Sequence, residues 1–328
     1  MTLAARVATV GDPVVHVDEE FYLTVARRML HGDLLYVDVW DRKPIGLFLL
    51  YASVAWLPPG AAVVGYQLLA SGFVWLTSLV AAALAARAGW RRGAVAGASL
   101  YILWLDIADG QGGQAPAFYN LFTAAAAWAT MRAGDREVDA RARLRLGLAA
   151  MLIVGLALQI KYSVVFEGGT FGLWLLWIEW RASRSVRLLL MRGAAWVAAA
   201  LLPTTLALGC YAAIGRAQPF LYANFLSILH RGGDPLADQR HNLIESTTIL
   251  APLVLMGIAG VARAGDRTTA HRRHFLYAWL LAAILGFAAF GSWFNHYTLP
   301  VMLPAGVCAA AAFARWRAVR LAAVPLLL

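Results

Sequence analysis

Charged residues are scarce in this chain of 328 amino acids. They make up 14% of it, against about 25% in soluble domains. By contrast, 61% of the residues are hydrophobic and the mean hydropathy is +0.65. A soluble protein of this composition could not cover its core with polar surface. The composition therefore excludes an ordinary soluble domain and predicts that many apolar side chains face lipid.

Cysteine is also rare, which excludes a disulfide framework. Cys210 and Cys308 both lie inside apolar runs and lack the spacing of a metal site, so we interpret them as small packing residues. The net charge of +10 does not indicate nucleic acid as a partner, because the arginines form short clusters between apolar runs and not one basic face.

The first residues lack the features of a membrane helix and of a signal peptide. Residues 1–17 are short, are interrupted by Gly11, Asp12 and Pro13, and contain no apolar core of the signal-peptide kind. We predict an N-terminal tail here.

Apolar runs fill the chain from residue 61 to 328 and predict an all-α polytopic membrane protein. A spanning helix needs about 20 mostly apolar residues, and extension of the shorter runs into their flanks gives about 9 to 11 such helices. The runs are Ala61–Ala86, Gly93–Leu105, Ala115–Met131, Leu146–Val164, Gly168–Ile178, Gly193–Ile214, Ser246–Ala262, Phe275–Phe290 and Thr298–Ala314, with a cut-off run at Val319–Leu328.

The charges alternate between the two sides that these runs define. Five loops, near residues 87–92, 132–145, 181–192, 263–273 and 315–320, hold 19 of the 28 basic residues. The other connections hold 13 of the 18 acids. The positive-inside rule makes the basic side cytoplasmic and predicts that residues 18–60 are extracytoplasmic. Ile45–Leu57 is too short to span, so we expect an interfacial or re-entrant helix there.

The outer segment from Asp18 to Pro44 carries the strongest functional pattern. Phe21, Val25 and Met29 recur at helical spacing, with Tyr22 and Ala26 beside them, and predict one apolar face of a helix that begins at Asp18 and ends at Gly32. Read alone, Asp18 and Glu19 suit a helix cap and its first turn. The combination of paired acids, aromatic residues, a glycine turn and Lys-Pro before an interfacial helix favours a functional site.

This segment resembles membrane glycosyltransferases of the GT-C fold, in particular protein O-mannosyltransferases and lipid A aminoarabinose transferases. The ordered match is fairly specific and comprises Asp18, Glu19, Tyr22, Ala26, Arg27, Met29, Leu30, Gly32, Tyr36, Asp38, Lys43 and Pro44. Phe294–Pro304 and Gly155–Tyr162 are similar to two later segments of the family. The resemblance implies a GT-C-like helical bundle, extending from Asp18 to about Ala314.

The resemblance also implies the chemistry. A sugar would pass, with inversion, from a polyprenyl-phosphate donor to a lipid, glycan or protein acceptor at the outer face of a bacterial cell membrane. Asp18 would be the general base, with Glu19 as its orienter or as a binder of the acceptor. Adjacent carboxylates would raise one another's pKa. Lys43, His296 and Tyr297 would hold the donor phosphate, and the helix at 45–57 would hold the prenyl chain.

Other residues are weaker candidates, and each has a simpler reading. Tyr22 and Arg27 belong to the motif, although Arg27 can simply meet lipid head groups. Lys161 can enter the site with Glu167 as its partner, or extend its ammonium to the membrane surface. Tyr297 can belong to an aromatic belt, and His296 can pair with a loop acid.

The chain departs from the family pattern in several ways. The family's first transmembrane helix is not found before Asp18, and the last apolar run stops at the chain end, so we expect a truncated or reduced homologue. Relatives carry a second outer acid where this chain begins a helix at Gln114. Asp106 or Asp109 can replace that acid, and Gln111 or Gln114 can bind sugar hydroxyls.

Cofactor and function both keep alternatives. No metal-ligand cluster is evident beyond the loop acids, so a divalent cation stays open as a cofactor. A transporter or flippase for a lipid-linked substrate would share the spans, but it would place polar groups at mid-membrane and show internal repeats. A catalytically degenerate homologue is the other alternative.

Overall fold

The computed structural model describes residues 1–15, 17–230, 232–260, 269–289 and 291–315. Val319–Leu328, predicted to begin a further span, lies outside these residues. Within them, the only extended pairing is one isolated bridge between Leu35 and Val39. The elements are α1 (Thr2–Arg6), η1 (Val7–Thr9), α2 (Val17–Leu30), α3 (Ile45–Ala55), α4 (Pro59–Ala85), η2 (Ala86–Trp90), η3 (Arg91–Gly93), α5 (Ala94–Ile107), α6 (Ala115–Ala133), α7 (Ala140–Leu158), η4 (Tyr162–Val164), α8 (Val165–Ser183), α9 (Val186–Ala213), α10 (Ala217–Leu221), η5 (Tyr222–Leu226), η6 (Ser227–His230), α11 (Leu236–Ala259), α12 (Ala270–Ala288), η8 (Asn295–Tyr297) and α13 (Leu299–Arg315).

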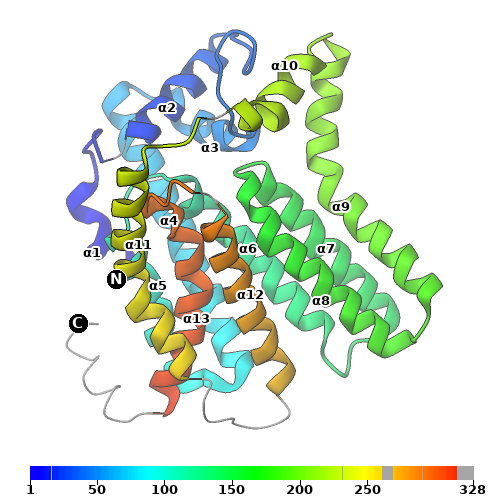
Figure 1. Ribbon diagram of the computed structural model, residues 1–328. Helices are drawn as coiled ribbons and strands as arrows, with labels where there is room; N and C mark the ends of the chain where they lie inside the picture. The colour runs from blue at the N-terminus through cyan, green and yellow to red at the C-terminus, as the bar shows by residue number, and fades with distance from the viewer. Residues whose placement is uncertain (16, 231, 261–268, 290, 316–328) are drawn as a thin grey trace.

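The long helices α4 to α9 and α11 to α13 form a bundle, and the short helices α2, α3 and α10 lie across one end of it (Figure 1). Three segments of the described chain are long and apolar enough to cross a membrane by length and composition, namely 59–107, 186–213 and 236–259. The first contains two helices, because the chain reverses at η2 and η3 between α4 and α5. The predicted all-α membrane architecture is therefore confirmed.

The helices are longer than several of the apolar runs that predicted them. α7 begins at Ala140, where the Asp139 side chain accepts a hydrogen bond from the amide of Ala142. α9 begins at Val186, where Ser185 accepts one from the amide of Leu188. Both are N-caps, and they extend each helix by a polar turn or more that hydrophobicity does not reveal.

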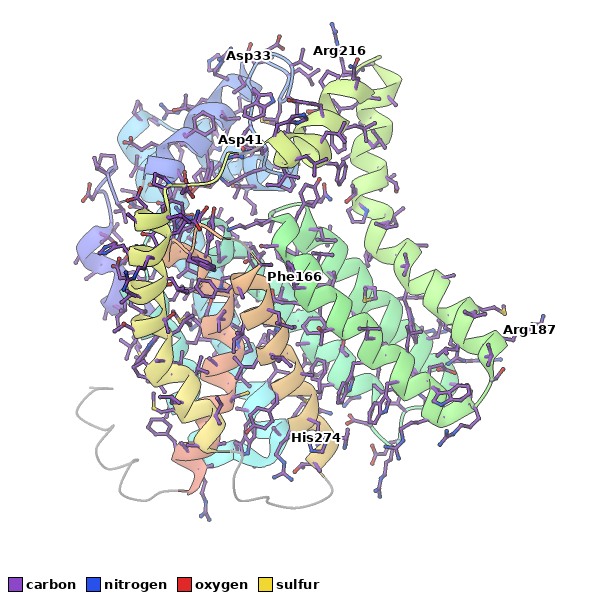
Figure 2. All side chains as sticks on the ribbon, in the orientation of Figure 1. Asp33, Asp41, Phe166, Arg187, Arg216 and His274 are labelled. Atoms are coloured by element: carbon purple, nitrogen blue, oxygen red, sulfur yellow. The ribbon has the colours of Figure 1, made fainter. Side chains whose placement is uncertain are left out.

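The loops alternate between the two ends of the bundle as the charge pattern predicted. Figure 2 places Asp33, Asp41 and Arg216 at the end that α2 and α10 cover, and Arg187 and His274 at the opposite end. At this basic end the carboxylate of Asp135 forms ion pairs with Arg87, Arg132 and Arg272. The cytoplasmic location of that end remains a prediction.

Small residues bring α5 and α13 into close contact. A Cβ atom on Gly97 would lie 2.5 Å from the carbonyl oxygen of Gly306, and one on Gly306 would lie 2.9 Å from the carbonyl oxygen of Gly97. Contacts between backbones of this kind are typical of membrane helices with small residues at their interface. This packing fixes the position of α13, and with it the loop that carries His296 and Tyr297.

The N-terminal segment, predicted as a tail, forms α1 and η1 and packs against α4 and α5. The Arg6 side chain is buried, and its Nη1 lies 2.8 Å from Oδ1 of Asp106. Arg6 also donates to the carbonyl oxygens of Gly110 and Gly112. The beginning of the chain therefore anchors the connection between α5 and α6.

The buried face of α2 contains most of the predicted apolar face but not Phe21. Phe21 is 42% exposed, whereas Tyr22, Val25 and Ala26 are fully buried. The spacing gave the helix correctly, but the position of its partner α3 determines which side is covered. The face that packs on α3 is therefore centred on Tyr22, Val25 and Ala26 and not on Phe21.

Candidate active site

Asp18 lies in the first turn of α2 and faces two polar partners. The Tyr22 hydroxyl, one helical turn further on, donates to its Oδ2 at 3.1 Å. The ammonium Nζ of Lys43 lies 3.9 Å from the same oxygen. Asp18 is half-buried, so its carboxylate is held by these groups while it remains accessible.

Two lysines of this region each lie over a tyrosine ring. Lys43 precedes α3, and its Nζ lies 4.6 Å from the centre of the Tyr22 ring. Lys161 lies between α7 and η4, and its Nζ lies 4.9 Å from the centre of the Tyr297 ring. Burial, with a further contribution from the Lys43 cation, lowers the pKa of Lys161 to about 8, while Asp18 acts in the opposite direction. The structure thus pairs Asp18 with Lys43 and Lys161 with Tyr297, and Lys161 is close enough to Asp18 and Lys43 to interact with both electrostatically.

Tyr22 connects Asp18 to α3. Its ring is fully buried and packs edge-on against Phe48 and Tyr51 of α3. A buried ring is unavailable to a ligand, so Tyr22 takes part in the site through its hydroxyl and the support that it gives to Asp18.

Glu19 is separated from Asp18 by its burial. Its carboxyl group is fully buried against Gly112 and accepts no hydrogen bond of regular geometry. Burial is the main cause that raises its pKa to about 7, and the adjacent Asp18 is only the smallest contribution. The Gly113 backbone, the Tyr66 hydroxyl and Arg6 oppose this shift. The predicted effect of Asp18 on the pKa of Glu19 is therefore present but small. The roles of Glu19 as orienter or acceptor binder stay predictions, and its carboxyl group is buried in this structure.

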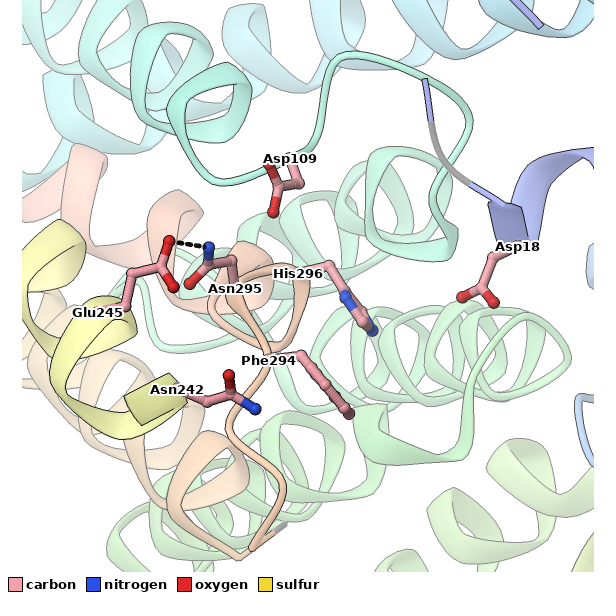
Figure 3. A pocket seen from close by; sticks show the side chains of 7 residues that line it. All are labelled: Asp18, Asp109, Asn242, Glu245, Phe294, Asn295 and His296. Atoms are coloured by element: carbon pink, nitrogen blue, oxygen red, sulfur yellow. Dashed lines mark hydrogen bonds between the residues drawn. The ribbon is translucent and has the colours of Figure 1, made fainter. Parts of the chain in front are cut away.

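An outer cavity of about 420 Å³ opens next to Asp18. Figure 3 shows its lining, which comes from α2, the connection after α5, α11 and the segment before α13. The Phe294 and His296 rings stack with their centres 5.7 Å apart, and the Asn295 amide donates to Oε1 of Glu245 at 2.8 Å. The seven lining residues are Asp18, Asp109, Asn242, Glu245, Phe294, Asn295 and His296.

Three other sequence candidates lie outside this cluster. Arg27, more than two helical turns after Asp18, donates to the carbonyl oxygen of Leu57 at the end of α3. Gln114 is buried at the start of α6, where its Nε2 has no hydrogen-bond partner. Asp106 pairs with Arg6, which leaves Asp109 as the outer acid of this connection that lines the cavity.

The predicted pairing of Lys161 with Glu167 is wrong. Glu167 belongs to the first turn of α8 and accepts a hydrogen bond from the Trp279 indole at 2.6 Å. No ion pair joins the two residues, although the structure describes both. The helix that begins at Val165 takes Glu167 into the bundle, whereas Lys161 stays in the preceding loop.

The sequence patterns did not identify Asn224, whose side chain accepts hydrogen bonds from two distant tyrosines. The Tyr162 hydroxyl donates to its Oδ1 at 2.9 Å. The Tyr36 hydroxyl donates to the carbonyl oxygen of Lys43 at 2.9 Å and more weakly to Asn224 at 3.4 Å. Asn224 thereby connects the segment of Lys43 with that of Lys161. The motif contained Tyr36, but no local signal identified a partner 188 residues away.

Asn242 and Glu245 were also missed, because α11 begins with polar turns that composition assigns to a loop. His, Cys, Asp and Glu side chains of the described residues form no group of three or more that could hold a metal ion. The three carboxylates of the cavity are thus distributed around it and do not converge on one point.

No family model matches the chain, and no curated protein sequence matches it. Two crystal structures of ArnT from Cupriavidus metallidurans match its fold at 15% sequence identity. The structure bound to undecaprenyl phosphate has a TM-score of 0.66 over 90% of this chain and 55% of the other. The apo structure has a TM-score of 0.62 over 92% and 56%. The chain thus spans about half the length of that protein, and its fold is similar to that of ArnT.

Proposed function

We propose that this chain is a membrane glycosyltransferase that takes a sugar from a polyprenyl-phosphate donor. The observation that supports it most strongly is the placement of Asp18 within 3.9 Å of Lys43, with Lys161 near both. A carboxylate beside two cations combines a proton acceptor with a site for an anionic leaving group. The ArnT-like fold, solved in one case with undecaprenyl phosphate, supports the choice of donor.

The reaction follows from these groups. Asp18 removes the proton from an acceptor hydroxyl as its oxygen forms a bond to the anomeric carbon of the sugar. The bond between that carbon and the phosphate oxygen breaks, and its electron pair leaves with the polyprenyl phosphate. Lys43 and Lys161 stabilise the negative charge that gathers on the phosphate, with His296 and Tyr297 as further hydrogen-bonding groups. Attack opposite to the leaving group inverts the anomeric carbon.

The surface helix α3 suits the prenyl chain. Leu49 of α3 is 55% exposed and Trp56, directly after it, is 71% exposed, whereas Leu47, Phe48 and Tyr51 are buried against the protein. An apolar outer face of this kind lies in a membrane interface. A polyprenyl chain along α3 would place its phosphate near Lys43, which precedes the helix by two residues.

The transfer assay tests this proposal. Vesicles with the full chain receive labelled polyprenyl-phosphate pentoses and hexoses together with membrane extract as acceptor. We expect label transfer, and we expect Lys43→Ala to lower kcat/KM for the donor by about tenfold or more, the order of a lost charged contact. Arg42→Ala removes a neighbouring exposed cation and serves as the control. Equal activity of the two variants would contradict a role of Lys43 in donor binding.

A further inference from the structure

The outer cavity has a lining unlike that of the cationic side of the site. Three carboxylates (Asp18, Asp109 and Glu245) and two carboxamides (Asn242 and Asn295) surround it. We propose that this cavity binds the acceptor, and that the acceptor is a sugar residue without negative charge. The inference rests on the proposed function, because it takes the wall formed by Asp18 as the place of proton removal.

The polar groups of the cavity match the hydroxyls of a sugar. Asn295 uses its Nδ2 for Glu245, and its Oδ1 is buried without a hydrogen-bond partner. Burying an unpaired acceptor costs free energy, so such groups point to a missing donor. Asn242 donates to the carbonyl oxygen of Ser292 at 2.9 Å, which turns its Nδ2 away from a ligand and leaves its oxygen as acceptor. Acceptor oxygens thus outnumber donors in the lining, as a ligand rich in hydroxyl donors requires.

An aromatic surface completes the cavity. Phe294 is 37% exposed, and its ring is nearly parallel to that of His296, with an angle of 7° between them. Small-molecule sites combine an apolar surface with a few polar groups that fix orientation. The C–H face of a sugar ring can pack on Phe294 while its hydroxyls reach the carboxylates on the other side (Figure 3).

Charge determines which sugars fit. Lys43 and Lys161 do not line the cavity, so these two cations lie on the donor side and the carboxylates on the acceptor side, while His296 lies at the border between the two. A phosphorylated or uronic acid sugar would bring a further negative charge among Asp18, Asp109 and Glu245, and like charges in a partly enclosed site repel strongly. Neutral and amino sugars meet no such repulsion.

Two residues beside the cavity have an unusual backbone conformation. Asp109, two residues after the end of α5, has φ 63°, and Trp293, directly before Phe294, has φ 43°. Non-glycine residues seldom occupy this left-handed region, and strain of this kind is typical of ligand sites. Asp109 stands after the helix end, where glycine would be favoured, and it presents a carboxylate there.

Binding of simple sugars to the full chain in lipid nanodiscs tests the inference. The probes are methyl glycosides of common hexoses and pentoses, their 6-phosphates where a C6 hydroxyl exists, and the matching uronic acids. Saturation-transfer NMR titrations give each dissociation constant. We expect at least one neutral glycoside to bind at least tenfold more tightly than its acidic counterparts.

Variants of the lining residues on different elements separate an effect on binding from an effect on folding. Asp109→Asn and Glu245→Gln should each reduce the preference for neutral sugars to below about threefold, and Phe294→Ala should weaken neutral sugars about tenfold. Glu20→Gln, an exposed acid of α2 outside the cavity, is the matched control and should match the wild type. Equal or tighter binding of the acidic sugars would overturn the inference, as would an unchanged preference in both carboxylate variants.

The outcome is distinguishable from failure of the proposed function. If the protein binds neutral sugars selectively but its transfer activity does not depend on Asp18, the sugar-binding cavity is supported and the proposed glycosyltransferase activity is contradicted. If Asp18-dependent transfer goes to a phosphorylated or uronic acid acceptor, the proposed enzyme activity is supported and the neutral-acceptor site is contradicted.

Discussion

Nη1 of Arg6 lies 2.8 Å from Oδ1 of Asp106, although 100 residues separate them. The Arg6 side chain is 1% exposed and that of Asp106 is 12% exposed. The same guanidinium holds the carbonyl oxygens of Gly110 and Gly112, and Gly112 in turn faces the Glu19 carboxyl. The beginning of the chain and the start of α2 are thereby connected through one loop.

Arg6→Met should destabilise the protein by about 3–5 kcal/mol, because it leaves the Asp106 carboxylate buried without its cation. Denaturant titration in detergent measures the free energy of unfolding. In the double variant Arg6→Met/Asp106→Leu we expect a smaller loss than the sum of the two single losses. Arg91→Ala changes an exposed arginine and is the control. Strict additivity of the two substitutions would contradict the pairing.

Stability should fall as the pH rises, because of Glu19. Its pKa in the folded protein, about 7, lies above the ordinary value of 4.5, so the folded state holds the proton more tightly than the unfolded state. The contribution is fully present below about pH 4.5 and is lost as the pH rises through 7, with a total on the order of 3 kcal/mol. Thermal unfolding in detergent between pH 4.5 and 8 measures it.

Glu19→Gln should flatten this part of the pH profile, since a carboxamide does not titrate. Glu20→Gln alters the next residue, which is exposed, and should keep the wild-type slope. If the Glu19→Gln protein follows the wild-type profile, the buried carboxyl is not the source of the pH dependence.

Asn224 should govern donor binding through the two lysine segments. In Asn224→Leu, the Tyr162 hydroxyl loses its acceptor and the weaker bond from Tyr36 is lost as well. We expect the donor KM to rise about tenfold, on the order of one or two hydrogen bonds, with a much smaller change in kcat. Asn224→Asp retains acceptor oxygens and should stay near the wild type. A fall in kcat alone, or equal effects of both substitutions, would contradict this positioning role.

Much of the fold follows from local patterns, but the site depends on contacts between distant segments. Apolar length predicts the bundle helices, and the spacing around Tyr22 predicts α2. Hydrophobicity does not reveal that α3 packs on the Tyr22 side and leaves Phe21 exposed, because both faces contain apolar residues. Helical caps such as Asp139 extend helices beyond their apolar runs.

The ordered motif names Asp18 and Lys43, and the structure places them side by side. It also names Glu19. Adjacent residues of a helix point in different directions, so Glu19 need not share the surroundings of Asp18, and its burial depends on a connection that is distant in the sequence. Arg6, Asn224 and Glu245 lack any motif, and their roles depend on chain segments that meet only in the folded protein. An ion pair across 100 residues leaves no periodic signal in the sequence.

The central claim is that Asp18 removes a proton during sugar transfer from a polyprenyl-phosphate donor. The most direct test is single-turnover transfer by Asp18→Asn in vesicles loaded with labelled donor, compared with wild type and with Glu20→Gln. Asparagine keeps the size of the side chain but cannot accept the proton. We predict a fall in the rate of roughly 10²- to 10⁴-fold, the usual contribution of a general base, with unchanged thermal unfolding and retained donor binding. A rate within about threefold of the wild type would contradict the account.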